Sequence, residues 1–91
     1  MLRDRSSPAA DPEALALNAL GWVLGDEDRA LRLLALTGLT PDALRERLGE
    51  RQVLAAVLDF LCAHEPDLLA AADALGIEPQ EIADARERLV A

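Results

Sequence analysis

The side chains most able to do chemistry lie in one short segment, where Cys62 and His64 are followed by Glu65 and Asp67. A thiolate beside an imidazole could bind a metal ion, or act as nucleophile and general base. A structural zinc site needs four ligands, however, and the chain has one cysteine and one histidine. We therefore interpret the pair as a half-buried thiol beside a helix-terminal histidine, and we expect no catalytic residue, metal or cofactor.

A second candidate is the acidic run Asp26, Glu27 and Asp28. Clustered carboxylates are hard oxygen ligands for cations, but this run lacks the spacing of a calcium-binding loop. We favour a helix start, where negative side chains interact well with the helix dipole. The chain also lacks a Gly-rich phosphate loop, a Gly-x-Ser-x-Gly elbow and a His-Glu-x-x-His motif, which removes the common signatures of nucleotide-binding proteins, hydrolases and metalloproteases.

A third cluster combines Asn18, Gly21 and Trp22 with Asp59 and Phe60. A polar amide and a helix-interior glycine indicate a closely packed neighbour, because glycine there lowers helix stability by about 1 kcal/mol relative to alanine. Asp59 precedes Phe60 as Gly21 precedes Trp22, and it could accept a hydrogen bond from Asn18 or from the indole. Two interpretations stay open: core specificity, or a groove or self-association surface centred on Trp22.

The elements that position these residues follow from composition. Leu and Ala dominate the 91 residues, while Trp22 and Phe60 are the only aromatics, which favours helices and one domain. All nine basic residues are arginine, and the formal net charge of -8 repels phosphate backbones and anionic lipid headgroups. We therefore expect no nucleic-acid partner and no membrane partner.

Targeting signals give a similar expectation. Leu2 is followed at once by Arg3, Asp4 and Arg5, which does not fit a secretory signal. The longest mainly apolar stretch, 14–24, is far short of the roughly 20 residues of a membrane span. A lone cysteine fits a reducing compartment, so we expect a cytoplasmic protein.

Proline and glycine positions predict an all-α fold, a compact single-domain bundle of about six short helices. Prolines occupy first-turn positions, and glycines close apolar runs. We expect a flexible N-terminal tail over 1–10 and one helical domain over 11–91. The predicted helices are 12–24, 27–37, one opened by Thr40 and Pro41 and ending at Gly49, 51–64, 66–75 and 79–90.

Hydrophobic periodicity separates these helices into two kinds. Helices 12–24 and 51–64 are apolar around almost the whole circumference, so we expect them at the centre. The outer helices are amphipathic. In helix 27–37 the predicted inward residues are Leu31, Leu34 and Ala35, with Arg29 and Arg32 outward; in helix 79–90 they are Ile82, Ala85 and Leu89.

The two central helices also match at an offset of 38 residues, which aligns Trp22 with Phe60. The same shift aligns the joint around Gly38 and Pro41 with the joint around Gly76 and Pro79. We hypothesise two pseudo-symmetric three-helix units, with the two central helices crossing at the axis. The alternative is that any two helix-turn-helix joints look alike.

The segments 14–22, 36–45 and 57–61 resemble the short bacterial proteins grouped as domain of unknown function 3572. The match runs through Asn18, Trp22, Gly38, Pro41, Asp59 and Phe60. The resemblance implies a small, cytoplasmic, all-helical protein, and it brings no assigned activity or catalytic residues.

Three function classes follow. We favour a protein interaction module or adaptor without catalytic activity, binding an unidentified protein or a second copy of itself, because the chain is too small to cover an all-round apolar helix. The second is an acidic antagonist of a basic nucleic-acid-binding protein, which requires the carboxylates to lie on one face. The third, a small enzyme or metal protein, would use Cys62 and His64.

Overall fold

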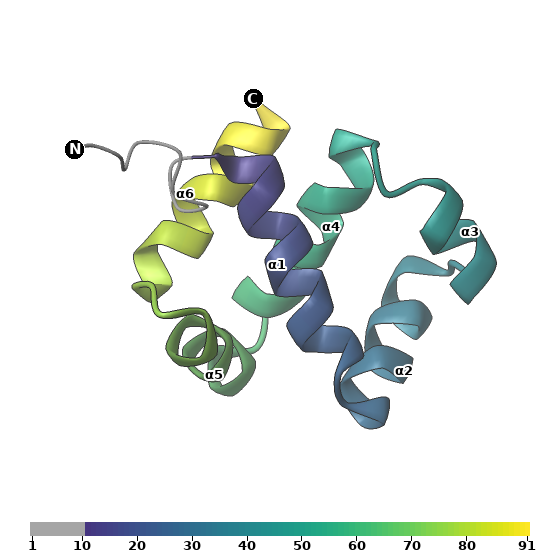
Figure 1. Cartoon of the computed structure of the whole chain (residues 1–91), viewed down its shortest axis with the longest axis horizontal. Helices are drawn as coiled ribbons and strands as arrows, with labels where there is room; N and C mark the ends of the chain where they lie inside the picture. The colour runs from purple at the N-terminus through teal and green to yellow at the C-terminus, as the bar shows by residue number, and fades with distance from the viewer. Residues whose placement is uncertain (1–10) are drawn as a thin grey trace.

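The computed structural model describes residues 11–91 and contains six helices over that range (Figure 1). No strand occurs among these residues, so the predicted all-α class is confirmed. The predicted tail over 1–10 lies outside the described part of the chain. The helices are α1 (Pro12–Leu24), α2 (Glu27–Thr37), α3 (Pro41–Glu46), α4 (Arg51–Cys62), α5 (Glu65–Leu75) and α6 (Pro79–Val90).

Side-chain caps fix where the helices begin. Asp11 accepts hydrogen bonds from the first turn of α1, Asp26 from Arg29 N of α2 at 3.0 Å, and Thr40 from α3. Glu78 opens α6 in a capping box. Each cap satisfies amide groups that have no partner inside the helix.

Helix ends follow the predicted glycines at three places, Gly25, Gly38 and Gly76, and depart from prediction at two others. Gly38 and Gly76 close α2 and α5 with φ of 75° and 71°, a left-handed conformation that favours glycine. α3 ends three residues before Gly49, because Arg47 N donates to two successive carbonyls and residues 47–49 form a turn. α4 ends at Cys62, since His64 is extended and serves as the N-cap residue of α5.

The two helices predicted to be central are central. α1 and α4 cross in the middle, and each packs against the other and against α2, α5 and α6 (Figure 1). The largest fully buried side chains come mostly from these two helices: Leu15, Leu33, Leu54, Leu58, Leu61, Ile82, Val23 and Val57. Burial of these aliphatic groups is the main source of stability in the fold.

α1 has one exposed face, as expected for an all-round apolar helix in a chain too small to cover it. Leu17 and Leu24 are almost half exposed, and Gly21 lies between them. A Cβ added at Gly21 would meet nothing within 4 Å. The predicted close packing at this glycine is therefore wrong within the described residues.

α2 is rotated relative to the prediction. Leu33 is fully buried and Leu34 half-buried, while Leu31 and Ala35 are exposed. The apolar residues of α2 surround most of the helix, so periodicity alone could not select the buried face. The face predicted for α6, Ile82, Ala85 and Leu89, is confirmed.

The helix boundaries keep the predicted 38-residue offset. α2 and α5 begin at 27 and 65 and end at 37 and 75, and α3 and α6 begin at 41 and 79. The packing of the third helices differs. α6 packs against α1, α4 and α5, whereas α3 lies at the periphery and makes only marginal contacts with other helices of the described chain (Figure 1).

Candidate functional site

An apolar groove lies where α3 stands away from α1 and α2. Its volume is about 340 Å³, and it is open to solvent. Leu20 and Leu24 of α1 form one wall, and α2 and α3 form the others. The complete lining is Leu20, Leu24, Ala30, Leu34, Pro41, Leu44, Arg45 and Leu48. We call this site the α3 groove.

Exposed leucines extend the apolar surface beyond the α3 groove. Leu24 lines the groove and is 46% exposed. Leu17 lies two turns earlier on the same face of α1, and Leu31 lies one turn before Leu34 on α2. Leu17, Leu24 and Leu31 are 44 to 57% exposed, so much of their apolar surface is in contact with solvent. Leu17 and Leu31 thus lie within two turns of residues that line the groove.

One charged residue, Arg45, contributes to the lining of the α3 groove. Arg45 pairs with Asp42 at 2.9 Å, so the cation in the lining is already neutralised. Glu27 and Asp28 at the start of α2 and Glu46 at the end of α3 are exposed and do not line the groove.

Trp22 lies on a different face of α1 from the groove. It is half-buried against the core, and the guanidinium carbon of Arg29 sits 3.7 Å from the ring centroid. Arg29 Nη2 also donates to Trp22 O at 2.7 Å. Arg29 Nε is buried and has no hydrogen-bond partner among the described residues. The cation–π contact with Trp22 is the interaction that this part of the guanidinium makes. Arg29 of the same chain therefore covers one face of the indole ring.

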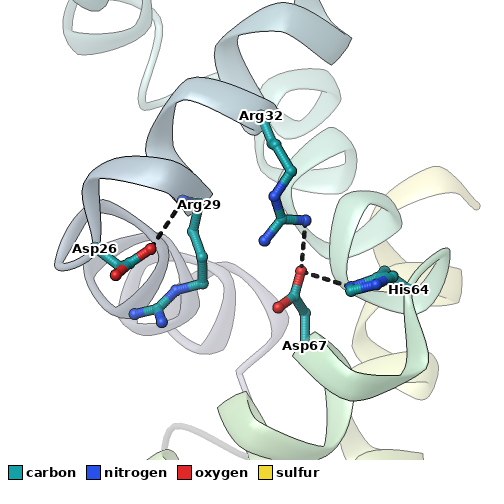
Figure 2. A network of polar contacts seen from close by, with 5 residues as sticks. All are labelled: Asp26, Arg29, Arg32, His64 and Asp67. Atoms are coloured by element: carbon teal, nitrogen blue, oxygen red, sulfur yellow. Dashed lines mark hydrogen bonds and ion pairs between the residues drawn. The ribbon is translucent and has the colours of Figure 1, made fainter.

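A polar network ties α2 to α5 (Figure 2). Arg32 Nη1 donates to Asp67 Oδ2 at 2.9 Å, and His64 Nδ1 lies 2.9 Å from the same oxygen. Arg32 also lies over the ring of Phe60, 5.4 Å from the centroid. The two arginines of α2, predicted to point outward, therefore cover the two aromatic rings.

Burial would raise the pKa of Asp67, but the hydrogen bonds from Arg32 and His64 outweigh it and hold that pKa below its ordinary value. Asp67 is 8% exposed and is the buried charged residue of the described fold. The carboxylate is thus ionised at neutral pH. Its arrangement is that of a structural clasp between helices rather than of an acid or base facing a cavity.

A family model described as "Protein of unknown function (DUF3572)" matches residues 9–91. The chain belongs to this family. No curated protein and no solved structure matches it. The expected resemblance is confirmed.

The Cys62 and His64 side chains of this DUF3572 member engage different partners. Burial raises the pKa of the Cys62 thiol, and Arg86 only partly offsets it. His64 is held by Asp67 instead. No group of three or more potential metal ligands occurs in the 11–91 range. The two side chains singled out first in the sequence therefore do not form a joint site.

The predicted cluster is also divided. Asn18 and Gly21 are exposed on α1, whereas Phe60 is buried in α4. Asp59 pairs with Arg86 at 3.1 Å, and no hydrogen bond joins it to Asn18 or Trp22 among the described residues. The core-specificity contact between these residues is thus absent.

Sequence reasoning missed the α3 groove. Its lining residues look like ordinary core leucines, and Leu44 and Leu20 are in fact buried. The available signal was the shortness of α3 between Pro41 and the glycine at 49. Within residues 11–91, no helix of this DUF3572 member has the length and apolarity needed to cross a membrane.

Proposed function

We propose that this protein is a small, acidic, non-catalytic interaction module of the cytoplasm, which holds apolar side chains of a protein partner in the α3 groove. The observation that carries the proposal is the groove itself, an open apolar site lined by leucines from three helices. Exposed apolar patches bordered by polar residues are typical of interaction sites.

The size of the α3 groove suits side chains rather than a large cofactor. About 340 Å³ lies at the low end of ligand pockets. Each aliphatic side chain transferred into such a site contributes roughly 1.5 to 3 kcal/mol if it becomes fully buried. Two anchors could therefore supply useful affinity after the costs of association are subtracted.

The chemistry of the remaining side chains supports a non-catalytic protein. A thiol with a raised pKa is a weak nucleophile at neutral pH, and the imidazole that could activate it is engaged by Asp67. Exposed carboxylates occur on all six helices, so no single acidic face favours the antagonist alternative over the groove.

Capture from the native cytosol with three baits tests this function: wild type, Leu24→Gln and Leu69→Gln. Leu24 lines the groove, while Leu69 is a comparably exposed leucine on α5. We expect a protein, or a second copy of the chain, that the wild type and Leu69→Gln retain and Leu24→Gln loses. If every retained protein is indifferent to Leu24→Gln, the groove is not an interaction site.

A further inference from the structure

We propose that residues 40–49, which contain α3 and the turn after it, form a hinged flap that detaches from α1 and α2 as one unit while the other five helices stay folded. We call this segment the α3 flap. Its motion requires no partner in the α3 groove, so it goes beyond the proposed function. Three features of the segment carry the proposal: its local polar contacts, its single buried side chain and its two joints.

The polar contacts of the α3 flap are local. Its side-chain contacts join residues three apart along the chain: Ala43 N to Thr40 Oγ1, Arg45 to Asp42 and Arg47 to Glu50. Within the 11–91 range, each hydrogen bond or ion pair of residues 40–49 has its partner within residues 40–50. These contacts would survive a movement of the whole segment, so they do not hold it to α1 or α2.

α6, the corresponding helix of the other unit, is held differently. Arg86 Nε lies 3.1 Å from Asp59 Oδ1, and Arg51 Nη2 donates to Arg88 O at 2.7 Å. Both contacts join α6 to α4 and would break if α6 moved alone. α6 also buries three apolar side chains. We therefore expect α6 to leave the fold only when the whole domain unfolds.

A single buried side chain anchors the α3 flap. Leu44 is 5% exposed and is the buried residue of the segment. Leu48 packs only partly against the core and, like Pro41, lines the open groove. α3 accordingly makes only marginal contacts with the other helices. Because one leucine contributes a small part of the buried apolar area, detachment should need only a fraction of the free energy of global unfolding.

Glycines lie at both joints of the α3 flap. Gly38 precedes the segment and Gly49 ends it, and a Cβ added at either residue would meet nothing within 4 Å. Glycine has the widest choice of backbone angles, which suits a hinge that must absorb a large change in φ and ψ. Rotation at these joints would carry the segment away from Leu20 and Leu34 of α1 and α2, and the α3 groove would widen.

Thiol labelling of matched cysteine variants tests the flap. Leu44→Cys and Ile82→Cys place a thiol at corresponding positions of α3 and α6, where the native side chains are 5% and 0% exposed. Both are made in the full chain with Cys62→Ser, which removes the native thiol. Leu36→Cys, at a residue that is 64% exposed, gives the rate of an open thiol.

The rate of reaction with an aromatic disulfide reagent is measured at increasing urea concentrations below the unfolding transition. Each rate is divided by that of the same variant in its unfolded state, which removes differences in thiol reactivity. The slope of the logarithm of the rate against urea reports the surface that the reactive opening exposes. Circular dichroism and urea unfolding check that each variant is folded under these conditions.

We expect Leu44→Cys to react at least about 100-fold faster than Ile82→Cys without urea, and at least about tenfold more slowly than Leu36→Cys. The urea slope of Leu44→Cys should be above zero but no more than about a third of the slope of Ile82→Cys, because the flap exposes a small part of the core.

Amide exchange of the wild type gives a second measurement that does not depend on the folding of a variant. The Leu44 amide donates to Thr40 O at 2.9 Å, and its exchange should depend on urea with a smaller slope than exchange of the amides in the buried turns of α6.

Two outcomes would overturn the flap. Equal urea slopes at positions 44 and 82 would mean that α3 leaves only with the whole domain. A rate at position 44 that does not change with urea would mean that the reagent reaches this residue through the open groove of a static fold. The slopes are independent of any partner, whereas the proposed function depends on capture by the Leu24→Gln bait, so the two can fail separately.

Discussion

The two ends of the molecule treat the third helix of each unit differently. α6 runs for twelve residues and packs onto α4, α5 and α1, while α3 runs for six and stays at the periphery (Figure 1). Leu44 and Ile82 occupy corresponding positions 38 residues apart, yet Leu44 borders the open groove and Ile82 is completely buried. The unit of α4, α5 and α6 is therefore closed by its third helix, whereas the unit of α1, α2 and α3 is open at its third helix.

The repeated sequence pattern determines where α3 and α6 begin, but it does not determine how they pack. The starts of α3 and α6 both follow a left-handed glycine and carry a proline in the first turn. Only the length that follows differs, because α3 must end in time for α4 to begin at Arg51. A short third helix buries little area, so it leaves apolar surface on α1 and α2 uncovered.

The largest effect should come from the corresponding pair Ile82 and Leu44. We expect Ile82→Ala to lower the free energy of unfolding by about 4 kcal/mol, because a closed core keeps the resulting cavity. Leu44→Ala should cost only about 2 kcal/mol, since its site already opens to solvent. Urea unfolding of both variants measures the difference. Equal losses would contradict the description of one closed and one open unit.

Asp67 and Arg29 also correspond, and the clasp at Asp67 should be the stronger. We expect Asp67→Asn to cost about 2 kcal/mol at pH 7, because charged hydrogen bonds from Arg32 and His64 are lost. The folded-state pKa of Asp67 is lowered, so its contribution is present above about pH 4 and disappears as the pH falls through the folded value.

Unfolding free energies of wild type and Asp67→Asn between pH 2 and 7 test this sign. The difference should shrink at the acidic end. A difference that grows toward low pH would mean that Asp67 is destabilising in its ionised form.

Arg29→Ala should have a smaller effect. Loss of the stack on Trp22 and of the bond to its carbonyl should cost about 1 kcal/mol. The indole would become more exposed, so its fluorescence emission should shift to longer wavelength. Arg45→Ala on α3 is the control and should leave the emission unchanged. An unchanged spectrum in Arg29→Ala would show that the arginine does not cover the ring.

Gly21→Ala should produce the smallest change in stability, and in the opposite direction. The added methyl group meets no neighbour, and alanine favours a helix by up to about 1 kcal/mol, so thermal unfolding should occur at higher temperature. A lower unfolding temperature in Gly21→Ala would contradict the open space beside this residue.

The sequence predicted helix boundaries well because the signals are local. Caps such as Asp11 and Thr40 and the left-handed glycines 38 and 76 act within a few residues of the chain. The misplaced end of α3 depends on a turn that begins at Arg47, two residues before the glycine at which the helix was predicted to end. The central position of α1 and α4 was also predictable, because apolar residues occur around almost the whole circumference of both helices.

The candidate site could not be predicted in the same way. The buried face of α2 is selected by Arg29 and Arg32 lying over rings on other helices, which are contacts between distant segments. Asp59 pairs with Arg86 because α6 packs against α4. The α3 groove exists because two helices fail to meet, and periodicity reports which residues are apolar without reporting which are left uncovered.

Amide hydrogen exchange followed by NMR tests the central claim most directly, because it compares the two third helices in one experiment. We predict weak protection of α3 and strong protection of the buried turns of α6 in the free protein. Protection of α3 equal to that of α6 before any partner is present would contradict an open groove.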